Sequence, residues 1–354
     1  MSLIAKPPTS LYTSDVLMKG FDPDSQASIV KTFSFQQYLA FKPLTVPGRQ
    51  SEAELAAVAA HDAGVNFHLL EYMYRKDNTE PKFVGVMGGA SIGRSALAYL
   101  KLAELTRFLS QQGFTVVTGG GPGMMEAAHL GAYFSRSSDE TWAKVIAAVK
   151  EIKANSPSDV ISRPVKKKGE NGWETFYDEA KLHAWFAWAN QLKVLSDTPG
   201  ESLAISTWEY GHEPVMPFAT AYACYFQNSI RESNLVRESR AGIIYGRGGG
   251  GTLREIWQDV EENYYAGSRE ELTPMIFFDE DRYWGDLSSG GTATVDILGT
   301  IIRTMNYAHR KHTFSWEDKI VATIDHEKIL GLLDKHVSQA RNKLTLFAQV
   351  AKLI

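Results

Sequence analysis

Three clusters of glycine each follow a short apolar run and precede a stretch whose apolar residues have helical spacing. Glycine at a strand-to-helix junction permits positive φ angles and lets a ligand approach the backbone closely. The helix that follows presents unpaired N–H groups and the positive end of its dipole, which suit a phosphate. Three such junctions on one sheet predict a nucleotide or a sugar phosphate as the ligand. The candidate binding residues are Gly88, Gly89, Ser91, Gly119, Gly120, Gly121, Gly123, Met124, Arg247, Gly248, Gly249, Gly250, Gly251 and Thr252.

Glu255 follows the third cluster, three residues after Thr252. One interpretation is structural: the two residues form a capping box, in which each side chain satisfies a backbone N–H of the other. The other interpretation is functional, with a carboxylate held beside the ligand. Breaking a ribosyl C–N bond passes through an oxocarbenium-like state, which a nearby carboxylate stabilises while it orients water. Both interpretations can hold together, because a helix N-terminus stabilises an ionised carboxylate.

Two further features could complete such a site. Glu126 lies just inside the stretch after the second cluster. It is either a second acid that contacts the ribose hydroxyls or an ordinary first-turn glutamate favoured by the helix dipole. Trp208, Tyr210 and His212 follow a predicted strand. Their rings could stack on a base, although aromatic clusters also serve packing.

Familiar nucleotide and metal motifs do not fit these segments. The dinucleotide fingerprint needs glycine at positions 88, 90 and 93, but Ala90 occupies the second of these. A Walker A loop would need a lysine where Arg94 stands. The sequence also lacks an HExxH helix and a closely spaced Cys/His set. We therefore expect neither a metal ion nor a cofactor.

The elements that must position these residues alternate along the chain. Apolar runs predict strands at about 82–89, 114–121, 202–208, 241–246 and 273–279, each apolar on both faces as in a parallel sheet. Helical spacing predicts helices at about 95–112, 124–134, 142–153, 218–237 and 249–265. This alternation predicts an α/β fold with a doubly wound, Rossmann-like parallel sheet.

The two ends of the chain are expected to extend this core. The sequence predicts three regions. They are a mostly helical N-terminal extension at 1–80, the Rossmann-like nucleotide-binding domain at 81–285, and a mainly helical C-terminal extension at 286–354. The last of these includes a short strand or extended segment near 320–325 and a helix that starts at residue 326. The run Lys166, Lys167 and Lys168 is interpreted as a solvated loop.

Composition narrows the class of protein. The chain has 354 residues, of which 44% are apolar and 22% charged, values typical of a folded globular protein. Its 37 basic and 41 acidic residues give a net charge of −4. That balance does not predict the broadly positive surface that binds nucleic acid or an anionic membrane. Cys224 is a lone cysteine, the N-terminus lacks a secretory h-region, and no apolar run approaches a membrane span. The expected location is the cytoplasm.

The segments VGVMGGAS, VVTGGGPGMMEAAHLGA and GGGGTLREI together resemble the LOG family of Rossmann-like nucleotide-binding proteins, formerly labelled lysine decarboxylases. The resemblance spans roughly residues 82–280, and the stretch GHEPVMPFATAYACYFQNSIRES looks like a longer bacterial subgroup. It implies a phosphoribohydrolase, which cleaves a nucleoside 5′-monophosphate to a free base and ribose 5-phosphate. It also implies a homodimer or higher homo-oligomer.

The resemblance assigns roles by position. Glu255 matches the motif glutamate, and Arg231 falls near the motif arginine, with Arg237 as its rival. The sequence departs from the family pattern where Arg247 replaces proline and Arg254 replaces the first of two frequent glutamates. These departures leave open an alternative, a protein that binds or senses a nucleotide without hydrolysing it. A pyridoxal-phosphate decarboxylase is a third interpretation.

Overall fold

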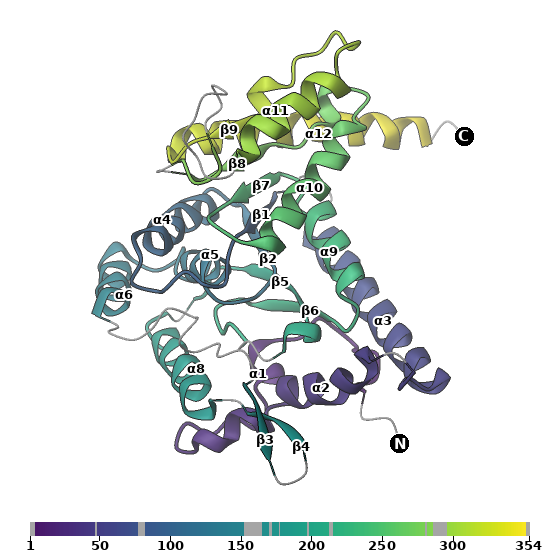
Figure 1. Ribbon diagram of the computed structural model, residues 1–354. Coiled ribbons are helices and arrows are strands. Elements are labelled where there is room, and N and C mark those ends of the chain that lie inside the picture. Colours follow the sequence, from purple (N-terminus) through teal and green to yellow (C-terminus); the bar gives the residue numbers. More distant parts are fainter. Residues whose placement is uncertain are drawn as a thin grey trace.

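The computed structural model describes residues 4–46, 48–76, 82–151, 165–169, 172–176, 178–196, 198–211, 215–279, 282–285 and 296–351 (Figure 1). Side chains are described within these ranges except at 75–76, 165–169, 172–176 and 340–351. His212 lies outside the described residues. So do residues 80, 81 and 286, which flank the predicted domain boundaries.

A parallel sheet forms the centre of the fold. Within the described residues it has seven strands in the order β6-β5-β2-β1-β7-β8-β9, and each neighbouring pair is parallel. The strands are β1 (Phe83–Met87), β2 (Thr115–Thr118), β5 (Ser202–Thr207), β6 (Ala221–Tyr225), β7 (Gly242–Tyr245), β8 (Met275–Phe277) and β9 (Ile320–Ala322). This order is that of a doubly wound α/β fold, as the sequence predicts.

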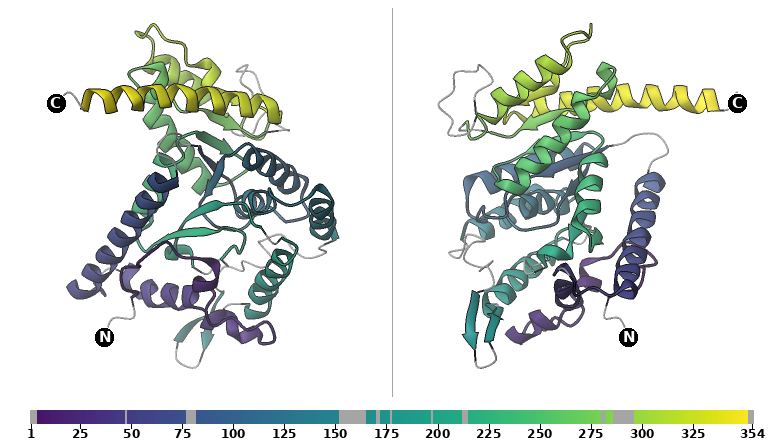
Figure 2. Two further views of the ribbon diagram at one scale, coloured as in Figure 1. Left: turned by 180° about the vertical axis from the view of Figure 1, so that it is seen from behind. Right: turned by 45° about the vertical axis from the view of Figure 1, so that its right-hand side comes forward.

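Helices cover both faces of the sheet, so neighbouring strand residues enter different cores. Val86 packs in one hydrophobic cluster with α4 (Leu97–Gln111), α5 (Met124–Tyr133), α6 (Asp139–Glu151) and part of α12 (His326–Ala351). Met87 packs in the other with α3 (Glu52–Lys76), α9 (Asn228–Arg237), α10 (Gly250–Tyr264) and α11 (Ile297–Ala308). Figure 2 shows α3 on the opposite side of the sheet from α4 and α6. Because both faces are covered, the strands are mostly buried and do not alternate between apolar and polar residues.

The N-terminal segment covers the β6 edge of the sheet. It contains α1 (Ser14–Leu17), η1 (Gln26–Lys31), α2 (Phe33–Phe41) and η2 (Lys42–Thr45) before α3. Tyr12 forms an antiparallel bridge with Tyr222 of β6, with both N···O distances 2.9 Å. Phe35 and Tyr38 pack against Trp185 of α8 (Glu179–Lys193) in a third hydrophobic cluster. The edge strand is therefore protected from pairing with other chains.

Two sequence predictions about secondary structure are wrong. The predicted helix at 218–237 is instead strand β6 followed by the shorter helix α9. A continuous apolar run does not distinguish a buried strand from a buried helix by periodicity, and all five residues of β6 are buried. The predicted lysine loop is strand β3 (Val165–Gly169), which forms an antiparallel hairpin with β4 (Gly172–Phe176).

The C-terminal segment takes part in the sheet itself. The predicted strand near 320–325 is β9, which pairs with β8 and forms the far edge. Helix α12 then packs Ile329, Leu333 and Val337 onto the cluster that contains α4. Short 3-10 turns η3 (Trp208–Tyr210), η4 (Arg269–Glu271) and η5 (Glu317–Lys319) complete the connections. No helix in the described ranges combines the length and apolarity of a membrane span.

Candidate active site

The three glycine clusters meet at one edge of the sheet. They follow β1, β2 and β7, which are neighbours in the order β2-β1-β7. Because the strands are parallel, their carboxyl ends share an edge. Strand order reverses between β1 and β7, and this is the switch point at which open α/β sheets bind ligands.

Backbone hydrogen bonds connect the three glycine loops to one another. The N–H of Gly89 donates to the carbonyl of Arg247 at 2.7 Å, and the N–H of Met124 donates to the carbonyl of Gly89 at 3.2 Å. Gly123 has a φ of +71°, and a side chain there would overlap the carbonyl of Gly89. Glycine at 123 is therefore required by both backbone conformation and space.

The third cluster leads into α10 without a side-chain cap. The helix begins at Gly250, its N-cap is Gly249, and no described side chain accepts a hydrogen bond from its first turn. A Cβ at Gly249, Gly250 or Gly251 would meet no described atom within 4 Å. Thr252 is thus inside the helix, and the predicted capping box with Glu255 does not form. The open helix N-terminus suits an anion.

Glu255 lies one turn further along α10 and pairs with Arg231 of α9. The distance between Glu255 Oε1 and Arg231 Nη1 is 3.5 Å, and each side chain is 10% exposed. Arg231 Nε also donates to the carbonyl of Ile205, within β5, at 3.1 Å. A methyl group at Gly119 would overlap Arg231 Nη2. Of the two candidate arginines, Arg231 is therefore the one that contacts Glu255.

The surroundings of Glu255 shift its proton affinity. Burial raises its pKa from 4.5 to about 7, the positive charge of Arg231 opposes that rise, and the carboxylate of Glu232 adds to it. A carboxyl group with a pKa near neutrality exists in both protonation states at physiological pH. Glu255 can therefore stabilise positive charge when ionised and exchange a proton with a reacting group.

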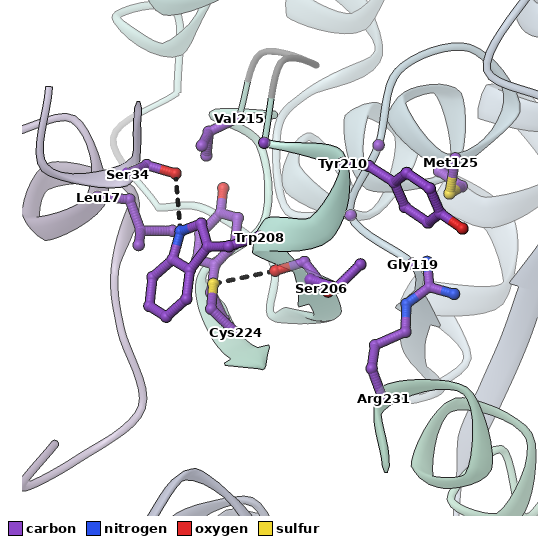
Figure 3. A pocket seen from close by; sticks show the side chains of 15 residues that line it. Leu17, Ser34, Gly119, Met125, Ser206, Trp208, Tyr210, Val215, Cys224 and Arg231 are labelled. Atoms are coloured by element: carbon purple, nitrogen blue, oxygen red, sulfur yellow. Dashed lines mark hydrogen bonds between the residues drawn. The ribbon is translucent and has the colours of Figure 1, made fainter. Parts of the chain in front are cut away.

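A small cavity of about 60 Å³ is lined in part by Arg231 (Figure 3). Figure 3 shows the guanidinium of Arg231 beside Gly119, Met125 and Tyr210, with Trp208, Leu17 and Cys224 at the other end. For comparison, an engineered cavity of about 150 Å³ holds benzene. A nucleobase therefore does not fit inside this space, and a base near Arg231 would have to lie at the mouth. Tyr210, which is 44% exposed, offers a ring there.

The other two predicted base-stacking residues differ in placement. Trp208 is 2% exposed and packs in the core, with its ring 4.6 Å from that of Phe226 and its Nε1 donating to Ser34 Oγ at 3.2 Å. His212 lies outside the described residues. Only Tyr210, among the described members of this predicted group, presents a ring to solvent at the cavity.

Glu126, the predicted second acid, is fully buried and paired. Its Oε1 lies 2.6 Å from Arg94 Nη2, and Arg94 Nε also donates to both carboxylate oxygens. The Arg94 guanidinium lies 3.5 Å from the ring centroid of Trp185 and 4.2 Å from that of Trp188. Arg94, which occupies the Walker A lysine position, thus joins the loop after β1 to α5 and α8 and does not border the small cavity.

Four other predicted residues have partners or line a cavity of their own. Met124 and Arg247 line a separate cavity at the same edge of the sheet. Arg254 pairs with Glu232, Nη2 to Oε2 at 2.6 Å, and its side chain is 61% exposed. Arg237 pairs with Glu238, Nε to Oε1 at 3.2 Å.

Several residues that line the small cavity belong to no sequence motif. Ser206 and Met125 line the small cavity, and Leu17 and Ser34 reach it from the N-terminal segment. Sequence spacing gives no signal for the last two, because they come from a distant part of the chain. Asp62 of α3 does not line this cavity, but it holds the start of the helix that carries Arg231: its carboxylate accepts the N–H groups of Phe226 and Gln227, each at 2.9 Å, just before α9.

A family model matches one segment of the chain, which ends before Arg231, the third glycine cluster and Glu255. A model of the SLOG cluster4 family matches residues 81–137, which contain β1, β2 and the first two glycine clusters. The matched segment resembles the SLOG, Rossmann-like superfamily, and this connects the chain with nucleotide-related function. No curated protein matches the chain. Within the described residues, no group of three or more His, Cys, Asp or Glu side chains could hold a metal ion.

Proposed function

We propose that this protein is a nucleoside 5′-monophosphate phosphoribohydrolase that uses Glu255. The observation that carries the proposal is the Arg231–Glu255 pair, at 3.5 Å, beside a glycine loop and one turn inside an uncapped helix. Helix α10 offers an anion site at its N-terminus, which can anchor a nucleotide's phosphate, and on the next turn a carboxylate, which can assist cleavage of the glycosidic bond.

In this proposal the 5′-phosphate binds the open amides at Gly249, Gly250 and Gly251, where no described atom fills the space. Binding there fixes the sugar, so that binding energy remote from the reacting carbon orients it. The ionised Glu255 then faces the ribose and stabilises the positive charge that develops at C1′. Arg231 favours the ionised form of Glu255.

The reaction breaks the bond between C1′ and the base nitrogen, whose electron pair leaves with the base. A water molecule supplies the oxygen that bonds to C1′. Its proton passes to Glu255, whose raised pKa allows it to accept the proton, and then to the departing base. The products are the free base and ribose 5-phosphate. The base itself would stack at Tyr210, outside the cavity of about 60 Å³.

One observation favours a second candidate function. The cavity beside Arg231 does not admit a nucleobase, so productive binding requires a base held at the open mouth. A protein that binds a nucleotide without hydrolysing it has no need to enclose the base. Incubation with a panel of nucleoside 5′-monophosphates distinguishes the two functions. Release of free base supports hydrolysis, whereas a raised melting temperature without release supports the binding protein.

A further inference from the structure

A second and larger cavity lies at the same edge of the sheet. Its volume is about 300 Å³, against about 60 Å³ beside Arg231. Small-molecule sites in proteins span roughly 300–1,000 Å³ and combine apolar walls with a few polar groups. The larger cavity falls within that range and the smaller one does not.

The walls of this cavity come from five places in the fold. Met124 begins α5, Arg247 follows β7, Phe278 and Asp279 follow β8, and Ile324 follows β9. The remaining wall is Ile92 and the start of α4, with Ala96, Leu97, Ala98 and Lys101. Met124 borders this cavity and Met125 borders the small one, so the first turn of α5 separates the two spaces.

The apolar walls suit a planar ring. Met124, Phe278 and Ile324 provide a thioether, an aromatic ring and a branched chain, and sulfur and aromatic groups pack well against a flat face. Arg247 also lines the cavity, and its guanidinium lies 5.3 Å from the ring centroid of Tyr283. Because a guanidinium stacks on aromatic faces, this side chain can pack on a planar ligand as well.

The charged groups suit an anion. Lys101 and Arg247 both line the cavity. The one lining carboxylate, Asp279, accepts the N–H of Tyr283 at 2.8 Å and the N–H of Trp284 at 2.9 Å, one with each oxygen. These hydrogen bonds hold Asp279 within its own loop, and its single negative charge is outnumbered by the two positive charges of Lys101 and Arg247. Helix α4 starts at this wall with Ala96 as its N-cap, and no described side chain caps the helix there. The positive end of the helix dipole therefore adds to the positive charges of the two basic residues.

We infer that this cavity is a second ligand site, which binds a small planar aromatic molecule carrying a phosphate or carboxylate. Its volume is about twice that of a cavity that holds benzene. A bicyclic ring with one anionic group is therefore a suitable probe. The inference does not rest on hydrolysis by Glu255, because the two cavities share no lining residue, although Met124 and Arg247 are also among the nucleotide-binding residues that the sequence predicts.

The test is fluorescence titration of the full chain with 1-naphthyl phosphate, compared with 1-naphthol and inorganic phosphate. We expect one equivalent of 1-naphthyl phosphate to bind, and each of the other two probes to bind about tenfold more weakly or less. Ala98→Trp fills the cavity and Lys101→Ala removes a cation, so each variant should weaken binding by about tenfold or more. Ala143→Trp and Lys150→Ala, at exposed positions of α6, are the matched controls.

Three results would overturn the inference. Absence of binding to the wild-type chain is the first, and binding of 1-naphthol as tight as that of 1-naphthyl phosphate is the second. The third is binding that survives in Ala98→Trp but is lost in Arg231→Leu, since the probe would then occupy the cavity beside Glu255. If Ala98→Trp fails to fold, as judged by circular dichroism, Lys101→Ala decides the outcome.

Discussion

Replacing Glu255 by glutamine should stabilise the protein at neutral pH while it abolishes turnover. Burial raises the pKa of Glu255 from 4.5 to about 7. Each pKa unit corresponds to about 1.4 kcal/mol, so ionised Glu255 reduces the free energy of unfolding by about 3 kcal/mol above pH 7. Glutamine has nearly the same shape and carries no charge to desolvate.

The sign of the pH dependence follows from proton binding. Between pH 4.5 and about 7 the folded chain keeps a proton on Glu255 that the unfolded chain releases. The contribution of Glu255 to stability therefore falls as pH rises through this window. The gain from Glu255→Gln should be about 3 kcal/mol at pH 8 and less than about 1 kcal/mol at pH 5.

Chemical denaturation of wild type and Glu255→Gln at these two pH values measures the difference directly. Comparing the two pH values cancels any pH-independent effect of glutamine itself. Glu261→Gln, an exposed change on the same helix, is the control and should show no such pH-dependent gain. Equal effects of Glu255→Gln at pH 5 and pH 8 would refute the reasoning, because they would mean that folding does not raise the pKa of Glu255.

Three other changes test separate parts of the structure. Arg94→Met should lower the free energy of unfolding by about 3 kcal/mol or more, because it leaves Glu126 fully buried without its partner. Chemical denaturation measures the loss, and an unchanged unfolding midpoint would contradict the prediction. Gly119→Ala should displace the Arg231 guanidinium and reduce the rate of nucleotide turnover by about tenfold or more while the fold persists. Turnover at the wild-type rate would show that Arg231 is not needed in this position. Tyr210→Ala should weaken nucleotide binding by about tenfold, because base–aromatic stacking contributes about 1–3 kcal/mol. Calorimetry measures the Kd, and an unchanged value would mean that the base binds elsewhere.

The sequence predicts the central sheet well because its signals are local. Each glycine cluster ends an apolar run, and the runs at 82–89, 114–121 and 241–246 are strands β1, β2 and β7. Gly113, which follows helix α4, has a φ of +86°, a left-handed conformation that glycine adopts readily. Such features depend on neighbouring residues and so are visible in a single sequence.

Long-range contacts explain what the sequence does not reveal. Nothing local distinguishes Arg231 from Arg237, yet the register of α9 against α10 brings only the former to Glu255. Glu126 lies in the expected first turn, but its carboxylate pairs with Arg94 across the loop after β1. The approach of Ser34 to Trp208 joins segments that are 174 residues apart.

The central claim, hydrolysis of a nucleotide by Glu255, is tested most directly by product stoichiometry. The purified chain would be incubated with each nucleoside 5′-monophosphate of the panel, and the free base and ribose 5-phosphate would be quantified by chromatography. We predict equal amounts of the two products from at least one nucleotide, and none from Glu255→Gln, which should still bind that nucleotide. Equal release by the variant and the wild type, or binding of nucleotides without any release, would contradict the claim.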